Sequence, residues 1–220
     1  MTKAKAVLFD LDGTLLDSIL VYERVFDRIL RHFALPHAKK EMVRQFMRRG
    51  KNPWKDKMPG ICLTRDMITE GEAIARQSFF KEYRNIHIMQ GVVSLLSELS
   101  DMSIKTAIVT SSIYGNDVTG SARRVMEMVD TVVTKFDTER QKPYPDPIFK
   151  ACEALSVSPD ACIFVGDSPL DIQAGKAAGM PVVGVTWGVS SVERLKRENP
   201  DEIAVSFHHL RRIIFSHLAN

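Results

Sequence analysis

The sequence predicts an α/β protein, a Rossmann-like parallel sheet with an all-helical segment inserted after its first strand. An apolar run at residues 4–9 has the length of a buried strand, and Gly13 breaks it soon afterwards. Residues 18–85 contain only helical periodicity. Beyond Gly91, short apolar runs alternate with helical segments, which is typical of a parallel sheet with right-handed crossovers.

The inserted segment begins with apolar residues that recur at steps of three and four between Ser18 and Phe33. Further helices are expected at about 39–49 and 64–84, separated by proline- and glycine-containing breaks. The first strand has no partner of its own, so it must join the later strands. We therefore expect a core domain formed by residues 1–17 and 89–220, and a helical cap domain formed by residues 18–88.

The second half supplies the remaining strands and their crossovers. Strands are expected at 105–109, 131–133, 162–165 and 182–185, with a weak strand near 203–205. Helices are expected at about 92–99, 117–128, 147–155, 170–178 and 208–218. Each of these helices except the last leads into a following strand, so the strands should run in the same direction.

Composition sets broad limits on the class of protein. The chain has 220 residues, of which 45% are hydrophobic and 26% charged, typical of a globular protein. Its three cysteines form no CxxC pair, which favours reduced thiols and a cytoplasmic location. No apolar stretch is long enough for a membrane span, so we expect no membrane association. Chain length leaves monomer and homodimer open.

Two aspartates, Asp10 and Asp12, follow the first strand. Alternation predicts that both point to the same side, with Leu11 on the other. Like charges this close raise each other's proton affinity unless a cation intervenes, so the pair indicates a metal, a shared proton or both. A simple Asp-Gly turn is the alternative.

Polar residues also follow the other predicted strands. Thr110 and Ser111 come after the second strand, and Asp167 and Asp171 come after the strand at 162–165. Lys142 lies in a proline-rich segment before a helix. The carboxyl edge of a parallel sheet is the usual place for ligands, so these residues should converge there.

Four segments of the chain resemble, in the same order, the sequence motifs of the haloacid dehalogenase-like hydrolases. The resemblance is to the branch of phosphoglycolate phosphatase and β-phosphoglucomutase, which has a helical cap. The matching segments are DLDGT at 10–14, IVTSS at 108–112, KPYPDP at 142–147 and VGDSPLDIQAGKAAGM at 165–180. A tryptophan and glycine after the last long core strand, Trp187 and Gly188, are also similar. The cap resembles the family only in length and helicity.

The resemblance implies a Mg²⁺-dependent phosphatase acting on a small phosphorylated metabolite. Asp10 would be the nucleophile that forms an aspartyl-phosphate, and Asp12 the general acid and base. Lys142, Thr110, Ser111 and the backbone at Gly13 would bind the phosphoryl oxygens. The implied metal-binding residues are Asp10, Asp12 through its carbonyl, Asp167 and Asp171.

Other reactions remain open on the same scaffold. Asp12 argues against dehalogenation and against lysine-dependent phosphonate hydrolysis, because related enzymes of both kinds lack an acid at this position. A sugar phosphomutase and a pyrophosphatase stay as alternatives. A receiver-like phospho-binding module is the non-enzymatic alternative, although such a module would be about half this length and lack a helical insertion.

A basic stretch at 39–57 carries eight Lys and Arg residues against two acids. Arg48, Arg49 or Lys51 is expected to bind a second anionic group of the substrate when the cap closes. A solvated helix face is the alternative. The stretch has only Phe46 and Trp54 for stacking and no nucleic-acid motif, so we expect no nucleic-acid partner.

Overall fold

The computed structural model describes residues 4–36, 40–49, 64–84, 86–112 and 119–219. Within these ranges the side chains of Lys40, Met42, Phe46 and Arg49 are not described. The expected substrate residue Lys51 lies outside the described residues, as do positions 113–118.

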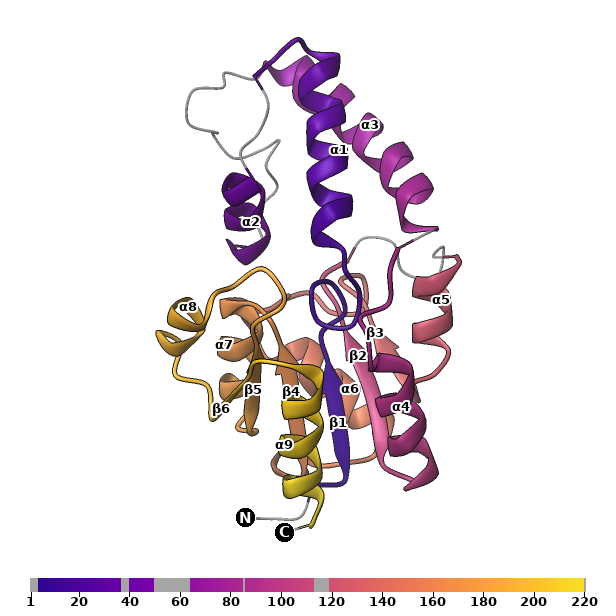
Figure 1. Cartoon of the computed structure of the whole chain (residues 1–220), viewed down its shortest axis with the longest axis vertical. Coiled ribbons are helices and arrows are strands. Elements are labelled where there is room, and N and C mark those ends of the chain that lie inside the picture. The colour runs from indigo at the N-terminus through magenta and orange to yellow at the C-terminus, as the bar shows by residue number, and fades with distance from the viewer. Residues whose placement is uncertain (1–3, 37–39, 50–63, 85, 113–118, 220) are drawn as a thin grey trace.

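Six parallel strands form one sheet in the order β3-β2-β1-β4-β5-β6 (Figure 1). Their bounds are β1 Ala6–Phe9, β2 Lys105–Val109, β3 Thr131–Val133, β4 Cys162–Gly166, β5 Val182–Val185 and β6 Glu202–Ala204. β1 pairs with β2 on one side and β4 on the other, so the first strand occupies the middle of the sheet. The predicted α/β class with a parallel sheet is confirmed.

Side chains of alternate strand positions build two apolar layers, as the period of two requires. Val7, Phe9 and Ile108 pack with α4 (Val92–Asp101), α5 (Ser121–Met126) and α9 (Phe207–Ala219) on one face. Leu8 and Phe164 pack with α6 (Asp146–Leu155) and α7 (Pro169–Ala177) on the other. The central strands are buried on both faces, which explains why their sequences are continuous apolar runs instead of alternating ones.

In the described part of the chain between β1 and α4, the inserted helices are α1 (Ile19–His32), α2 (Lys40–Arg49) and α3 (Arg65–Tyr83). They lie beyond the end of the sheet at which β1 terminates (Figure 1). The two connections run side by side, because Asp17 N–H donates to the carbonyl of His87 at 2.9 Å and Leu16 bridges to Ile88. The domain bounds 1–17, 18–88 and 89–220 stay a prediction.

The sequence pattern located most elements within a few residues and missed two. The missed elements are a 3₁₀ turn at Pro159–Ala161 and the short helix α8 (Val192–Lys196), which Ser191 caps through its side chain. The helix expected at 117–128 is described only as α5. In the described ranges, no helix has both the length and the apolar character that a membrane span needs.

Gly175 allows α7 to approach the sheet closely, and this contact is testable. A Cβ there would lie 2.5 Å from Cγ2 of Val182 and 3.2 Å from Cδ1 of Phe164. We expect Gly175→Ala to lower the free energy of unfolding by about 1–3 kcal/mol through overpacking, measured by urea denaturation. In the Val182→Ala background the added methyl has room, so the loss should shrink. Equal losses in both backgrounds would contradict the packing explanation.

Candidate active site

The site begins where β1 ends, in a loop that returns on itself. Asp10 still follows the sheet, because its N–H donates to the carbonyl of Val165 in β4 at 2.8 Å. Leu15 and Leu16 N–H groups then both donate to the carbonyl of Leu11, and Gly13 has a φ of +86°. The strand pattern therefore ends at Asp10, and the loop sets the position of Asp12.

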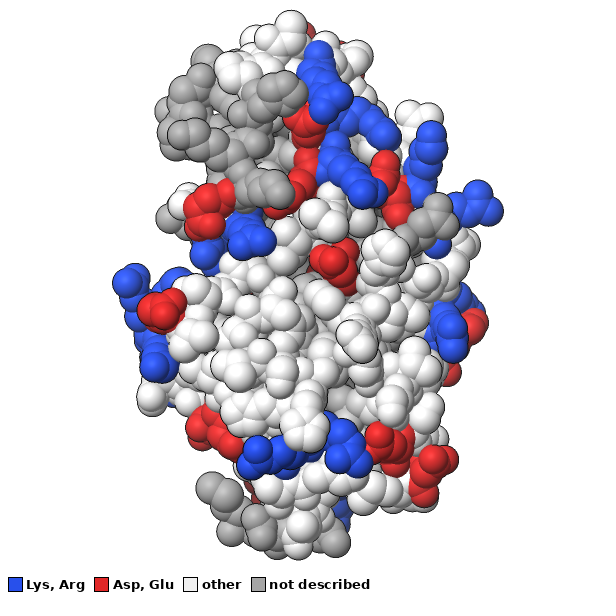
Figure 2. Space-filling view, viewed as in Figure 1, with Lys and Arg blue, Asp and Glu red and all other residues white. Residues whose placement is uncertain are grey.

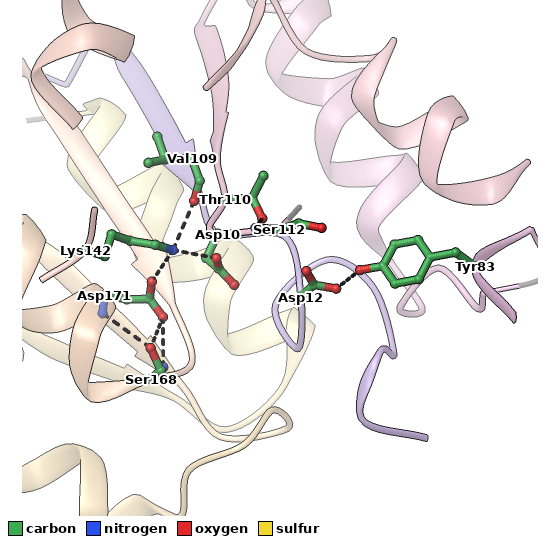
Figure 3. A network of polar contacts seen from close by, with 9 residues as sticks. All are labelled: Asp10, Asp12, Tyr83, Val109, Thr110, Ser112, Lys142, Ser168 and Asp171. Atoms are coloured by element: carbon green, nitrogen blue, oxygen red, sulfur yellow. Dashed lines mark hydrogen bonds and ion pairs between the residues drawn. The ribbon is translucent and has the colours of Figure 1, made fainter. Parts of the chain in front are cut away.

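Lys142 joins the ends of separate elements through its buried ammonium group (Figure 3). Nζ donates to Oδ1 of Asp10 at 2.6 Å, to Oδ1 of Asp171 at 2.6 Å and to the carbonyl of Val109 at 3.1 Å. Burial alone would lower the pKa of Lys142, but the two carboxylates outweigh it and raise the pKa above its usual value. The lysine is therefore held as a cation.

Both carboxylate oxygens of Asp171 accept hydrogen bonds from the protein. Oδ1 accepts from Lys142, and Oδ2 accepts from the backbone N–H and the hydroxyl of Ser168 at 3.0 and 2.5 Å. Together with the bond from Asp171 N–H to the Ser168 hydroxyl, this forms a capping box at the start of α7. Asp171 thus fixes Lys142 and begins the helix at the same time.

Asp167 lies at the end of β4 and is 1% exposed. Val189 N–H donates to its Oδ2 at 2.6 Å. Two glycines enclose this oxygen, since a Cβ at Gly188 would fall 1.9 Å from it and a Cβ at Gly13 would fall 2.3 Å from it. Glycine at both positions therefore leaves room for the Asp167 carboxylate between the two loops.

The carboxylates of Asp10, Asp167 and Asp171 each offer one oxygen, and these oxygens lie within 4.8 Å of one another. Burial raises the pKa of Asp10 to about 7, and the charge of Asp171 adds to this against the opposing effect of Lys142. Burial, then Asp10 and Asp171, raise the pKa of Asp167 well above its usual value. Crowded, buried carboxylates with raised pKa values are what a hard divalent cation would stabilise.

Asp12 lies outside this three-carboxylate cluster and has a different partner. The hydroxyl of Tyr83, the last residue of α3, donates to Oδ1 of Asp12 (Figure 3). Burial raises the pKa of Asp12, and hydrogen bonds from Tyr83 and Ser18 oppose that rise. Sequence reasoning missed Tyr83, which occurs at a core position of a helix and has only 3% of its surface exposed.

Thr110 and Ser111, which are expected to bind phosphate, follow β2 at the same edge of the sheet, but they differ in solvent exposure. Thr110 is buried, its N–H donates to the carbonyl of Val133 at 2.9 Å, and its hydroxyl accepts from Ser112 N–H at 3.0 Å. Ser111 is exposed beside it. Trp187 donates from Nε1 to the carbonyl of Thr14 at 3.1 Å and so supports the loop that carries Gly13. Sequence reasoning had noted Trp187 and Gly188 without a role.

Of the three residues expected to bind a second anionic group, the structure describes the side chain of Arg48 alone. Arg48 lies on α2 and forms an ion pair with Glu41. Arg49 closes α2, but its side chain is outside the described atoms. Arg48 also lines a cavity together with Arg194 and Arg197 at α8, and no described ion pair or hydrogen bond joins it to the three-carboxylate cluster.

Comparison with known proteins agrees with this geometry. The model for haloacid dehalogenase-like hydrolases matches residues 7–185. The chain belongs to this family. Phosphoglycolate phosphatase of Escherichia coli (strain K12) is 30% identical over 241 aligned residues, covering 94% of this chain and 90% of the relative. PpaX of Caldanaerobacter subterraneus subsp. tengcongensis, provisionally named a pyrophosphatase, is 31% identical and covers 96% and 95% of the two chains.

A solved structure supports the fold of this family member over nearly its whole length. The haloacid dehalogenase-like hydrolase from Streptococcus pneumoniae superposes with a TM-score of 0.79 at 24% identity, covering 97% of this chain and 99% of that one. The predictions of the family and of an enzyme of the phosphatase type are confirmed.

Asp167 and Asp171 should respond differently when their charge is removed, because only Asp171 pairs with the ammonium group of Lys142. In EDTA, Asp167→Asn should be at least as stable as wild type, since the amide oxygen can accept from Val189 while a buried charge is removed. Asp171→Asn should lose about 3 kcal/mol by breaking a buried pair with Lys142. Urea denaturation measures both. Equal losses would show that the two carboxylates are equivalent.

Proposed function

We propose that the protein is a Mg²⁺-dependent phosphatase that hydrolyses a small phosphorylated metabolite through a phosphorylated Asp10. The single observation that carries this proposal is the buried Lys142 held between Asp10 and Asp171, beside the carboxylate of Asp167. A fixed cation next to a crowded carboxylate suits an anionic phosphoryl group. The family supports the same chemistry.

Asp10 is the proposed nucleophile. A carboxylate oxygen of Asp10 forms a bond to phosphorus while the bond from phosphorus to the leaving oxygen breaks, and Asp12 gives its proton to that oxygen. Water then attacks the phosphorus of the aspartyl-phosphate and gives a proton to Asp12. This second step releases inorganic phosphate and restores the carboxylate of Asp10.

Asp12 suits this double role because its environment differs from that of Asp10. Burial favours its protonated form, and the hydroxyl of Tyr83 favours its ionised form. The two effects act in opposite directions on the pKa of Asp12. This balance suits a group that must first give a proton and then take one. We assign Tyr83 as a positioning residue that orients the carboxyl of Asp12.

The remaining polar groups are proposed to hold the transferring phosphoryl group. Lys142 neutralises one of its oxygens, and the hydroxyl of Thr110 with the backbone amides at Gly13 and Ser111 binds the others. The ammonium of Lys142 is fixed by three hydrogen bonds before substrate arrives, so little reorganisation is needed. The site is in this sense preorganised.

Asp10 and Asp167 are the proposed direct ligands of Mg²⁺. The described hydrogen bonds use Oδ1 of Asp10 and Oδ2 of Asp167, which leaves the second oxygen of each carboxylate for a cation. Asp171 contributes by holding Lys142, and the carbonyl of Asp12 is a further candidate ligand. When bound, Mg²⁺ supplies positive charge that offsets the repulsion between carboxylates and phosphate.

Phosphoglycolate is the substrate class we favour, since a named phosphoglycolate phosphatase and a provisionally named pyrophosphatase are both similar over most of this chain. Pyrophosphate hydrolysis and sugar phosphomutation use the same nucleophile and acid, so they remain the alternatives. The buried cysteines Cys152 and Cys162 are free thiols 3.9 Å apart, which favours a reducing, cytoplasmic location. Monomer and homodimer are both compatible with the site.

The nucleophile can be tested by covalent labelling. With Mg²⁺ and a ³²P-labelled substrate found by screening phosphorylated metabolites, acid quenching should trap label on the wild-type chain and none on Asp10→Asn. Turnover of Asp10→Asn should fall at least about 10³-fold, because the covalent route is lost. Full turnover in Asp10→Asn would refute the proposal. Addition of Mg²⁺ should also raise the melting temperature of wild type and leave that of Asp167→Asn unchanged.

The role of Tyr83 can be tested through the pH profile. Loss of its hydroxyl removes a hydrogen bond that lowers the pKa of Asp12, so Tyr83→Phe should move the basic limb of kcat/KM to higher pH. We also expect kcat to fall about threefold to tenfold. Tyr144→Phe, at an exposed tyrosine, is the matched control and should change neither. A lower rate without displacement of the profile would indicate only a structural role.

A further inference from the structure

A cavity of about 480 Å³ lies between α2 and α8, apart from the carboxylate cluster. Its lining consists of Gln45 and Arg48 from α2 and Arg194 and Arg197 at α8. Lys and Arg side chains gather over α8 and beside the end of α2 in Figure 2. The cavity therefore brings together guanidinium groups from the inserted helices and from the sheet side of the molecule.

Acidic partners only partly balance these arginines. Arg48 pairs with Glu41, and Arg194 pairs with Glu198 at 2.8 Å. Arg197 has no ion pair among the described residues, and Arg44 lies one turn before Arg48 on α2. Among the described residues, the three lining arginines have two glutamate partners between them, which leaves a surplus of positive charge at the cavity.

Burial makes this surplus costly. The side chain of Arg48 is 15% exposed, whereas its partner Glu41 is 60% exposed and so neutralises it weakly. Nε of Arg44 is buried without a hydrogen-bond partner in the described part of the chain. A half-buried guanidinium that faces other guanidiniums loses hydration and gains repulsion. An anion in the cavity would offset both.

The lining specifies the chemistry of that anion. Arginine forms paired hydrogen bonds with phosphate and carboxylate oxygens, and three arginines that converge from two helices suit a polyvalent tetrahedral anion. The volume suits a small molecule. The described lining of the cavity contains no aromatic side chain that could stack on the bases of a nucleic acid.

We propose that this cavity, the arginine cleft of Gln45, Arg48, Arg194 and Arg197, binds a phosphate-type polyanion and thereby holds α2 against the sheet domain. The phosphate group can belong to a distal part of the substrate or to a separate small molecule. Both sources present the same oxygens to the same arginines. The proposal does not depend on the phosphatase reaction, because binding requires no turnover.

Isothermal titration calorimetry with methylenediphosphonate, in EDTA, tests the cleft directly. Without a metal the carboxylate site carries four acids against Lys142 and repels anions, so binding reports on the arginines. Arg197→Ala and Arg194→Ala should each raise the Kd about tenfold, the effect of losing one charge-assisted contact. Arg212→Ala, an exposed arginine of α9, is the charge-matched control and should change the Kd less than twofold.

Arg197 is exposed, so its substitution should leave the fold intact, and the unchanged melting temperature of Arg197→Ala verifies this. Failure of wild type to bind, an unchanged Kd in both cleft variants, or an equal loss in Arg212→Ala would each overturn the proposal. Loss of turnover in Asp10→Asn has no bearing on this measurement. The two claims therefore fail separately.

The source of the phosphate follows from a second titration, with fructose 1,6-bisphosphate and fructose 6-phosphate, with and without Mg²⁺. If the cleft holds a second phosphate of the substrate, Mg²⁺ should strengthen bisphosphate binding in wild type and much less in Arg197→Ala. If the ligand is a separate molecule, the effect of Arg197→Ala should be the same with and without Mg²⁺. Either result supports a phosphate-binding cleft.

Discussion

The ammonium group of Lys142 is the constraint on which the site depends. It reaches Asp10 after β1, Val109 at the end of β2 and Asp171 in α7, residues that are far apart in the sequence. Burying this charge costs several kcal/mol unless each of its hydrogens is paired. All three donations are made, so the sheet order that brings β1 between β2 and β4 is also the order that satisfies the lysine.

The position of Lys142 also explains how the carboxylates of Asp10, Asp167 and Asp171 can lie close together in the folded protein. Lys142 offsets part of the charge of Asp10 and Asp171, yet burial, with repulsion from neighbouring carboxylates added to it, still raises the pKa of Asp10 and of Asp167. The residual repulsion is what a divalent cation would relieve. Stability and affinity for a cation thus oppose each other at this edge, as they often do at functional sites.

Local pattern was enough to predict the sheet and the residues at its edge. Strand periods, the breaks at Gly13 and Gly91 and the order of the polar residues each follow from neighbours in sequence. The partner of Asp12 does not, because Tyr83 appears in the sequence as one more apolar position of α3. The helix α8 has five residues, too few to show a helical period, so Arg194 and Arg197 gave no signal until the fold placed them opposite α2.

Among the described contacts between the inserted helices and the rest of the protein, two involve groups with a proposed chemical role. Tyr83 at the end of α3 contacts Asp12, and α2 faces Arg194 and Arg197 across the arginine cleft. The connections to these helices are two neighbouring segments at Asp17 and His87, which leaves the helices few other constraints at that point. A movement of the helices about these segments would therefore change the surroundings of Asp12 and the spacing of the arginines together. An anion that bridges the cleft would favour the arrangement in which Tyr83 reaches Asp12, so binding at the arginines and orientation of the acid are expected to be coupled.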